Sequence, residues 1–362
     1  MIPETFNGLN MHIMTQEIGS EFWLEEVSNP KAGLGFHPDR FGFVGDGLYC
    51  LSGRTAIDLI CRDIAESRLL RKVYLPSYCC ESMVYPFTNR GIEVVFYDQK
   101  PEYRQDVDLL YLTNYFGYVS DYDVDVVRQY HDNGTVIVYD RTHSLFGQSD
   151  EIVGYADYSF GSFRKWMAVP TGAYLCKKDG AFCVHPDKDC PFVKNRIEAM
   201  ELKGRYLRDD ANVTKDLFFA KFNIFATKLT EDYVGYKMDG LSLEMLSTYD
   251  VENMLKSRKE NASLLYAMLK DVGNLEFWDD ATDTALLFVP VLCKNKEDRD
   301  ALRSFLIQHE IYCPVHWPKG PWIQPGSYAD RLVDRELSLL CDQRYGEEQM
   351  IRIAHTIKEY YK

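Results

Sequence analysis

The stretch DLLYLTNYFGYVSDYDVDVVRQYHDNGTVIVYD, residues 108–140, decides the fold class. Its first ten residues and its last six are apolar and β-branched runs, typical of buried strands. Between them, DYDVDVVRQYHDNG indicates a helix that ends at Asn133-Gly134, since Asn and Gly commonly terminate helices. A strand, a helix and a second strand in this order form a βαβ unit, in which the two strands are parallel.

The same alternation extends from about residue 47 to residue 180. The run GLYCL leads through SGRT into the helical pattern AIDLICRDIAESRLL, and the strand-like KVYLP, EVVFYD and YADYSFGS follow, with a helix at about 77–90. We therefore predict a three-layer αβα fold with a mostly parallel sheet.

The remainder of the chain differs in pattern. Residues 191–270 are mainly helical, and then come the strand-like ALLFVPVLC, the helix EDRDALRSFLIQHE, the strand IYCPVHWP and the helix GEEQMIRIAHTIKEYY. We predict that residues 1–240 hold an N-terminal segment and the large α/β domain, and that residues 241–362 form a smaller C-terminal α+β domain. A long helix around 250–270 crosses between the two.

Composition excludes several classes of protein. A net charge of −14 argues against nucleic-acid binding, which needs a basic face. No run approaches the roughly 18 apolar residues of a membrane span, and the N-terminus has no secretory signal pattern. The ten cysteines show no zinc spacing, so we expect no metal site and reduced thiols in the cytoplasm.

Polar residues follow the expected strands where parallel sheets bind ligands. Ser52-Gly53-Arg54-Thr55 precedes a helix whose free N–H groups suit a phosphate, although an ordinary helix cap would look the same. Asp140 ends a buried strand, and Lys165 follows a loop and one further strand. A lysine, an aspartate and a phosphate-binding helix N-terminus are what pyridoxal phosphate requires: an amine for its aldehyde and a carboxylate for its ring nitrogen. A capping role for Asp140 and a solvated Lys165 stay open.

Several motifs, in order, resemble those of the DegT/DnrJ/StrS-type sugar aminotransferases, a family of fold-type-I pyridoxal-phosphate enzymes. The resemblance spans most of the chain and is carried by SGRTA at 52–56, YLPSYCCES at 74–82, GIEVVFYD at 91–98, YDRTH at 139–143, SFRK at 162–165, PTGA at 170–173, CPVHWP at 313–318 and LSLLCDQRY at 337–345.

The resemblance implies a role for each matching residue. Lys165 is the Schiff-base lysine that forms the internal aldimine, and Asp140 is the partner of the pyridine nitrogen. His143 lies where the family often has Gln, near the ring hydroxyl. The phosphate is held by Gly53, Arg54 and Thr55, mainly through backbone N–H groups, and by the Ser162 hydroxyl.

The family also implies an activity and an assembly. We expect an aminotransferase that aminates a keto group of a nucleotide-linked sugar with glutamate as donor. We expect a homodimer with active sites at the subunit interface, for which the helices at 217–230 supply apolar contact. Lys237 stands where the family has an asparagine that reaches the neighbouring subunit's cofactor phosphate.

Three departures from the family motifs bear on the site. The interval from Ser162 to Lys165 is two residues shorter than usual, and PTGA replaces Gly-Glu-Gly-Gly. Cys80 aligns with the aromatic residue that stacks on the cofactor ring, so Tyr78 or Tyr115 is expected to take that role. A catalytically altered scaffold that serves as a binding protein is the main alternative. A glycosyltransferase-like enzyme is a weaker one, because its Asp-x-Asp motif at 121–123 falls at the start of a helix.

Overall fold

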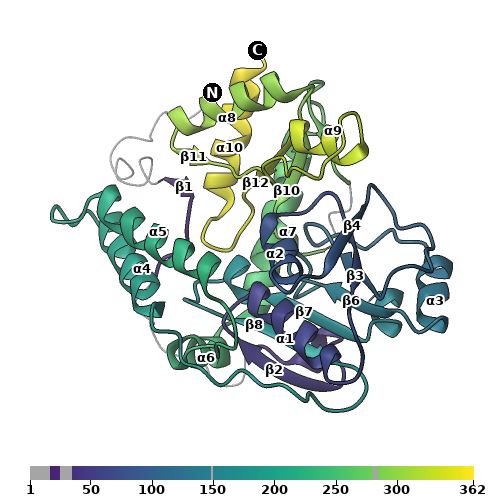
Figure 1. The fold of residues 1–362 in the computed structure, drawn as a ribbon. Helices are drawn as coiled ribbons and strands as arrows, with labels where there is room; N and C mark the ends of the chain where they lie inside the picture. The colour runs from purple at the N-terminus through teal and green to yellow at the C-terminus, as the bar shows by residue number, and fades with distance from the viewer. Residues whose placement is uncertain (1–16, 25–34, 148–149, 280–283) are drawn as a thin grey trace, which may run out of the picture.

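A computed structural model describes residues 17–24, 35–147, 150–279 and 284–362 (Figure 1). Its centre is a seven-stranded sheet in the order β2-β8-β7-β6-β5-β3-β4. Strands β3 to β7 pair in parallel, whereas β8 is antiparallel to both β7 and β2. The predicted, mostly parallel sheet is therefore confirmed. Its strands are β2 (Asp46–Cys50), β3 (Lys72–Pro76), β4 (Glu93–Tyr97), β5 (Leu109–Thr113), β6 (Val136–Asp140), β7 (Tyr158–Ser162) and β8 (Ala173–Lys177).

Alternating side chains of the central strands make the sheet the middle of three layers. On β5, Leu109 and Tyr111 pack in one apolar cluster with α1 (Gly53–Ala65) and α2 (Glu81–Thr88). Leu110 and Leu112 point to the opposite face, where they pack with α3 (Val124–Asp132). Successive residues of a strand point to opposite faces, so a strand that is apolar throughout is buried between two helical layers.

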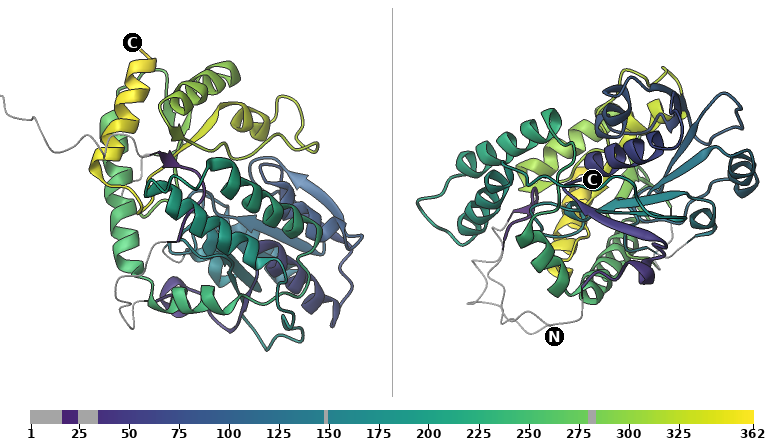
Figure 2. Two further views of the ribbon diagram at one scale, coloured as in Figure 1. Left: turned by 90° about the vertical axis from the view of Figure 1, so that its left-hand side faces the viewer. Right: turned by 60° about the horizontal axis from the view of Figure 1, so that its bottom comes forward.

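The C-terminal part forms a smaller α+β unit, as predicted. Strands β9 (Glu276–Phe277), β10 (Val289–Leu292) and β12 (Glu336–Leu339) make an antiparallel sheet. Helices α8 (Lys296–Gln308), α9 (Tyr328–Arg335) and α10 (Glu347–Tyr360) complete it. Helix α7 (Val251–Leu269) packs against α10 and runs beside both units, as Figures 1 and 2 show.

Two details differ from the sequence-based expectation. The helix α6 (Gly240–Thr248) follows the predicted domain boundary, yet it packs in the cluster of the large unit that contains Trp166. Of IYCPVHWP, only Ile311–Tyr312 is a strand, β11, because its partner is the equally short β1 (Ile18–Gly19).

The β1–β11 pair brings the N-terminal segment to the C-terminal unit. The Gly19 N–H donates to the Tyr345 hydroxyl at 2.7 Å. Gly19 has a φ of 104°, and a Cβ there would lie 2.6 Å from the carbonyl oxygen of Tyr312, so only glycine fits. The chain then crosses between the two units.

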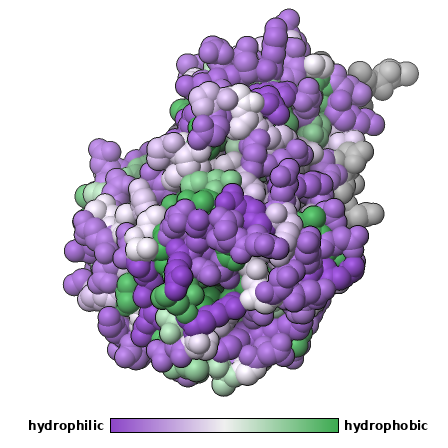
Figure 3. All heavy atoms as spheres, turned by 45° about the vertical axis from the view of Figure 1, so that its right-hand side comes forward, coloured by the Kyte–Doolittle hydropathy of each residue, from purple (hydrophilic) through white to green (hydrophobic). Residues whose placement is uncertain are grey.

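Helices α4 (Val193–Leu207) and α5 (Lys215–Glu231) form a pair beside the sheet (Figures 1 and 2). The face drawn in Figure 3 is hydrophilic over most of its area, in keeping with the net charge of −14. Within the described residues, no helix is both long and apolar enough to cross a bilayer.

Candidate active site

A cavity of ≈ 580 Å³ lies at the carboxyl ends of the parallel strands. The ends of β5, β6 and β7 contribute Thr113, Asp140 and Ser162 to its wall. The N-terminus of α1, the segment after β1 and the C-terminal unit form its other sides. This is where open α/β sheets bind ligands, because the strand ends leave a crevice there.

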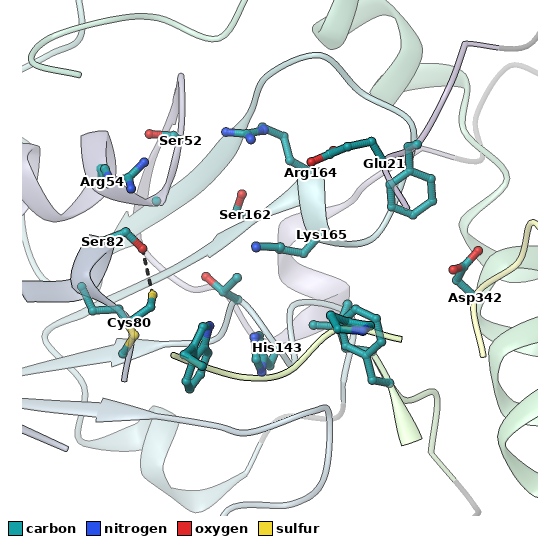
Figure 4. Close-up of a pocket in the computed structure, with 18 of the residues that line it drawn as sticks. Glu21, Ser52, Arg54, Cys80, Ser82, His143, Ser162, Arg164, Lys165 and Asp342 are labelled. Carbon is teal, nitrogen blue, oxygen red and sulfur yellow. Dashed lines mark hydrogen bonds between the residues drawn. The ribbon is translucent and has the colours of Figure 1, made fainter. Parts of the chain in front are cut away.

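Lys165 projects into this cavity from the short 3-10 helix, Phe163–Lys165, that follows β7. Figure 4 shows its amine pointing into the space between Ser162 and His143. The Lys165 side chain is accessible from within the cavity, and protein atoms of the cavity wall surround it on the other sides. This desolvation lowers the pKa of Lys165, with Cys80 opposing the shift and Arg164 adding to it. An amine with a lowered pKa is more readily neutral and therefore a better nucleophile and base.

Asp140, the last residue of β6, is held rigidly in the cavity wall. Its Oδ2 accepts from the Tyr111 hydroxyl at 2.6 Å, and its Oδ1 accepts from the Thr142 N–H at 2.8 Å. Burial raises the pKa of Asp140, while Thr142, Tyr111 and the charge of Lys165 oppose the rise. The carboxylate is thus oriented by two donors and has lone pairs left for a third.

His143 lines the same wall as a neutral ring. Burial, with the nearby charge of Lys165, lowers the pKa of His143 to about 3. The Phe116 N–H donates to Nδ1 at 3.3 Å. The proton of a neutral imidazole is then on Nε2, so His143 offers one N–H donor to the cavity.

The helix N-terminus is only partly available for a ligand. Gly53 and Arg54 line the cavity, and the first N–H groups of a helix have no acceptor within the helix. Thr55 does not line the cavity. Its N–H donates to the Ser52 side chain at 3.3 Å, and its hydroxyl donates to the Tyr233 carbonyl at 2.9 Å. The ordinary helix cap, which the sequence could not exclude, is therefore present, and the N–H groups at Gly53 and Arg54 are the ones left for a ligand.

Two other candidate residues lie away from the cavity. The Tyr78 hydroxyl donates to the His316 carbonyl, and its ring packs against Trp317 behind the wall. Trp317, rather than Tyr78, is the aromatic residue that faces the cavity from this side. Lys237 is half-exposed and pairs with Asp189 at 3.0 Å.

The structure adds residues to which the motifs assigned no binding role. Glu21 comes from the segment after β1, and Arg196 comes from α4. Arg164 precedes Lys165 within the SFRK motif, in which it had been given no role. The Cys80 Sγ lies 2.9 Å from the Ser82 hydroxyl, and both side chains line the wall opposite Arg164 (Figure 4).

The donor set fits pyridoxal phosphate. The cavity holds an amine of lowered pKa, an oriented carboxylate, a neutral imidazole N–H and a helix N-terminus. The side chains of Arg54, Arg164 and Arg196 also line the cavity, so an anion bound there would lie among three guanidinium groups. No group of three His, Cys, Asp or Glu in the described ranges is arranged to hold a metal ion.

Comparisons with known proteins bear on the family and on the fold. Residues 207–358 match the model of the DegT/DnrJ/EryC1/StrS aminotransferase family. No curated protein sequence matches the chain. Asp140 and Lys165 precede the matched range, so their assignment depends on the motifs and on the geometry of the cavity.

Solved structures share the fold at low sequence identity. The PLP form of Spr1654 from Streptococcus pneumoniae, described as a sugar aminotransferase, is 16% identical over 96% of this chain and 99% of its own, with a TM-score of 0.63. NtdA from Bacillus subtilis, solved with PMP, is 14% identical over 87% of this chain and 73% of its own, at 0.61. An aminotransferase of the family from Brucella abortus is 16% identical over 90% and 88%, at 0.60. The resemblance to the DegT/DnrJ/EryC1/StrS aminotransferases is confirmed by a family match over the C-terminal part of the chain and by a fold shared over nearly all of it.

Proposed function

We propose that the protein is a pyridoxal-phosphate-dependent aminotransferase that acts on a keto sugar. The observation that carries the proposal is the convergence of Lys165 and Asp140, from the ends of β7 and β6, in one cavity with the N-terminus of α1. Most lysines are solvated at the surface, so a lysine in a desolvated cavity beside a buried carboxylate indicates a functional site.

Pyridoxal phosphate, when bound, supplies an aldehyde that takes up amines and a ring that accepts electrons. Lys165 would hold the cofactor through its amine, and when free its Nζ would be placed to move a proton at the Cα of a bound amino donor. The Asp140 carboxylate would accept a hydrogen bond from the protonated ring nitrogen and favour its charged form. His143 would offer its Nε2–H to the ring oxygen, and Ser162, Gly53 and Arg54 would bind the phosphate.

The substrate and donor are the finer part of the proposal. We infer a keto group on a nucleotide-linked sugar as acceptor and glutamate as amino donor. The volume of ≈ 580 Å³ lies within the range of about 300–1,000 Å³ that is typical of small-molecule and cofactor sites. A structural neighbour, DesI, was solved in the presence of its TDP-sugar product.

The proposal includes a homodimer in the cytoplasm. Helix α5 exposes three large apolar side chains on its surface: Leu217, Phe219 and Ile224. Phe219 also lines the cavity, so a second copy packed on α5 would cover part of the site. Exposed apolar groups of this kind often mark protein contacts.

An absorption titration with pyridoxal phosphate tests the function directly. We expect wild type to gain a band near the visible edge that Lys165→Ala lacks and that Lys256→Ala, the matched control at an exposed lysine of α7 outside the cavity, retains. Reduction with borohydride followed by mass spectrometry would then find the cofactor mass on the Lys165 peptide. Excess glutamate should convert the band, and ¹⁵N from glutamate should appear in an aminated keto sugar nucleotide.

The alternative, a catalytically altered scaffold, is motivated by Cys80 at the stacking position. It predicts a lysine-dependent band that no amino donor converts. Absence of any band in wild type would reject the pyridoxal-phosphate proposal altogether.

A further inference from the structure

We propose that Glu336, Ser338 and His316 form a hydrogen-bonded proton relay in the C-terminal unit, which sets the position of the His316 ring proton behind the wall of the cavity. None of the three side chains is among those that line the cavity. Glu336 and Ser338 are therefore positioning residues, which act on the cavity through His316 and not by touching a ligand. The relay goes beyond the proposed function and does not depend on the cofactor.

The three groups form a closed set of contacts. Glu336 begins β12, and Ser338, two positions further on, points to the same face of the strand. The Ser338 hydroxyl is hydrogen-bonded both to Oε1 of Glu336 and, at 2.8 Å, to Nδ1 of His316. The backbone N–H of His316 donates to the second carboxyl oxygen, Oε2, at 2.6 Å. All three residues are buried, so little water competes for these contacts.

The carboxyl group of Glu336 keeps its proton at neutral pH. Burial raises the pKa of Glu336 to about 8, against opposing contributions from Ser338, the His316 N–H and Arg299. Oε2 accepts from a backbone N–H, which can only donate, so the acid proton lies on Oε1, the oxygen that faces Ser338. Oε1–H then donates to the Ser338 oxygen, and the Ser338 proton is directed to Nδ1 of His316. A neutral imidazole that accepts at Nδ1 carries its own proton on Nε2.

Loss of the Glu336 proton reverses both hydrogen bonds. Burial keeps the pKa of His316 well below its usual value, and His143 and Lys165 add to this shift, so the ring is neutral in both states. When Glu336 ionises, the Ser338 hydroxyl donates to the carboxylate instead, and the Ser338 oxygen accepts from Nδ1–H. The proton that leaves is then the one on Nε2. One proton is released in total, and it departs from the far end of the imidazole ring.

The charged groups around Glu336 leave this proton as the group that neutralises the carboxylate. The Arg299 guanidinium donates to the backbone carbonyls of Val333 and Glu336, at 3.1 Å each, and its Nε pairs with Asp300. In the part of the chain that the structure describes, no cation forms an ion pair with the Glu336 carboxylate. The other titratable groups within electrostatic reach are neutral side chains whose pKa burial raises: Tyr78, Cys293 and Cys313.

The relay ends beside two residues of the cavity wall. The His316 ring packs edge-on against the rings of His143 and Trp317, with centroids 5.5 Å and 5.4 Å apart. Both of those residues line the cavity. The Tyr78 hydroxyl donates to the His316 carbonyl, so the large unit holds the same residue from its own side. Ionisation of Glu336 therefore changes the tautomer of a ring directly behind this wall and adds a negative charge there, which favours cations in the cavity.

Long-range ¹H–¹⁵N correlation spectra of the full-length protein, without added ligand, report the tautomer of each histidine ring. The His316 signals are assigned by their loss in His316→Gln. In wild type we expect the ring proton on Nε2 below about pH 8 and on Nδ1 above it, because Glu336 ionises there. In Glu336→Gln we expect Nε2–H at every pH, since the amide donates to Ser338 as the acid does and does not ionise. Glu348→Gln, a change at an exposed glutamate of α10, is the matched control and should titrate as wild type does.

Ser338→Ala removes the link, so the His316 tautomer should no longer change near pH 8. The inference is overturned if His316 of wild type keeps one tautomer from below to above this pH. It is equally overturned if Ser338→Ala or Glu336→Gln changes tautomer at the same pH as wild type while circular dichroism shows it folded. The wild-type series needs no variant, so a variant that fails to fold leaves the test intact. The Lys165-dependent band tests the proposed function separately, because the relay is measured without cofactor.

Discussion

Arg258 on α7 ties the segment that carries Lys165 to the C-terminal unit. The side chain is fully buried. One guanidinium nitrogen donates to the carbonyls of Leu286 and Leu287, at 3.1 Å and 3.0 Å, and a second donates to the Trp166 carbonyl at 3.0 Å. The Nε donates to the Gln343 side-chain oxygen at 2.9 Å. The Cζ lies 4.8 Å from the centre of the Trp166 ring. One side chain of α7 thus binds two other backbone segments and the Gln343 side chain.

Substitution of Arg258 by Met should lower the free energy of unfolding by about 3–7 kcal/mol. The Trp166 carbonyl keeps a bond from the Gln343 amide at 2.7 Å, but the carbonyls of Leu286 and Leu287 lose a charged donor. Each such loss costs about 1–3 kcal/mol. Loss of the cation from the indole face adds about 1 kcal/mol. Met preserves most of the packing of the aliphatic stem. The Gln343 side-chain oxygen also loses its donor, but Gln343 is only partly buried, so this loss is smaller.

Urea unfolding followed by tryptophan fluorescence measures this loss. With a slope of about 3 kcal/mol per molar urea, the midpoint should fall by about 1–2 M. The urea midpoint of Arg258→Lys, which keeps the charge but has fewer donors, should lie between those of wild type and Arg258→Met. Arg128→Met, a change at a guanidinium that is 45% exposed, should leave the midpoint nearly unchanged. An Arg258→Met midpoint indistinguishable from that of Arg128→Met would refute the argument.

Three further predictions follow from shifted pKa values. Burial raises the pKa of Glu336 to about 8, so between about pH 4.5 and 8 the folded state keeps a proton that the unfolded state has lost, and the free energy of unfolding should fall as pH rises through this range. The urea midpoint of Glu336→Gln should therefore rise relative to that of wild type over the same range, and parallel pH profiles of the two proteins would contradict the argument. Burial opposes the ionisation of Glu21, but Arg196 and Arg164 outweigh it and lower the pKa of Glu21 to about 2, so the charged carboxylate stabilises the fold above about pH 4.5 and this effect is lost as pH falls toward 2. The difference in thermal midpoint between wild type and Glu21→Gln should therefore narrow on acidification. His143 is neutral at pH 5–8, so His143→Gln, which keeps an N–H donor, should bind pyridoxal phosphate in a spectral titration more tightly than His143→Leu, and equal affinities would exclude the proposed donor role.

The sheet was predictable from sequence because its strands are buried on both faces. A run such as VIVYD in β6 is apolar throughout and is followed by a polar residue at the ligand-binding edge. Asp140 and Lys165 could be placed in one site because consecutive parallel strands end at the same edge. Their roles in catalysis stay predictions until Lys165 and Asp140 are tested by substitution.

The remainder of the site depends on contacts that sequence spacing does not encode. Thr55 is one position beyond Arg54, and a rotation of about 100° per helical residue turns its side chain away from the cavity, toward Tyr233. Tyr78 was assigned to the cavity, but it packs behind Trp317, which arrives from the other unit of the chain. Arg196 and Glu21 meet only when α4 and the N-terminal segment are folded together.

The pairing of β1 with β11 sets the order in which the site is completed during synthesis. Residues 18–19 leave the ribosome 293 positions before their partners, residues 311–312. Glu21 lies only two positions beyond β1, so it takes its place in the cavity wall only when β1 has paired with β11. A nascent chain can therefore form its parallel sheet and expose Lys165 while the cavity is still open on one side, and the wall closes only after β11 has been made.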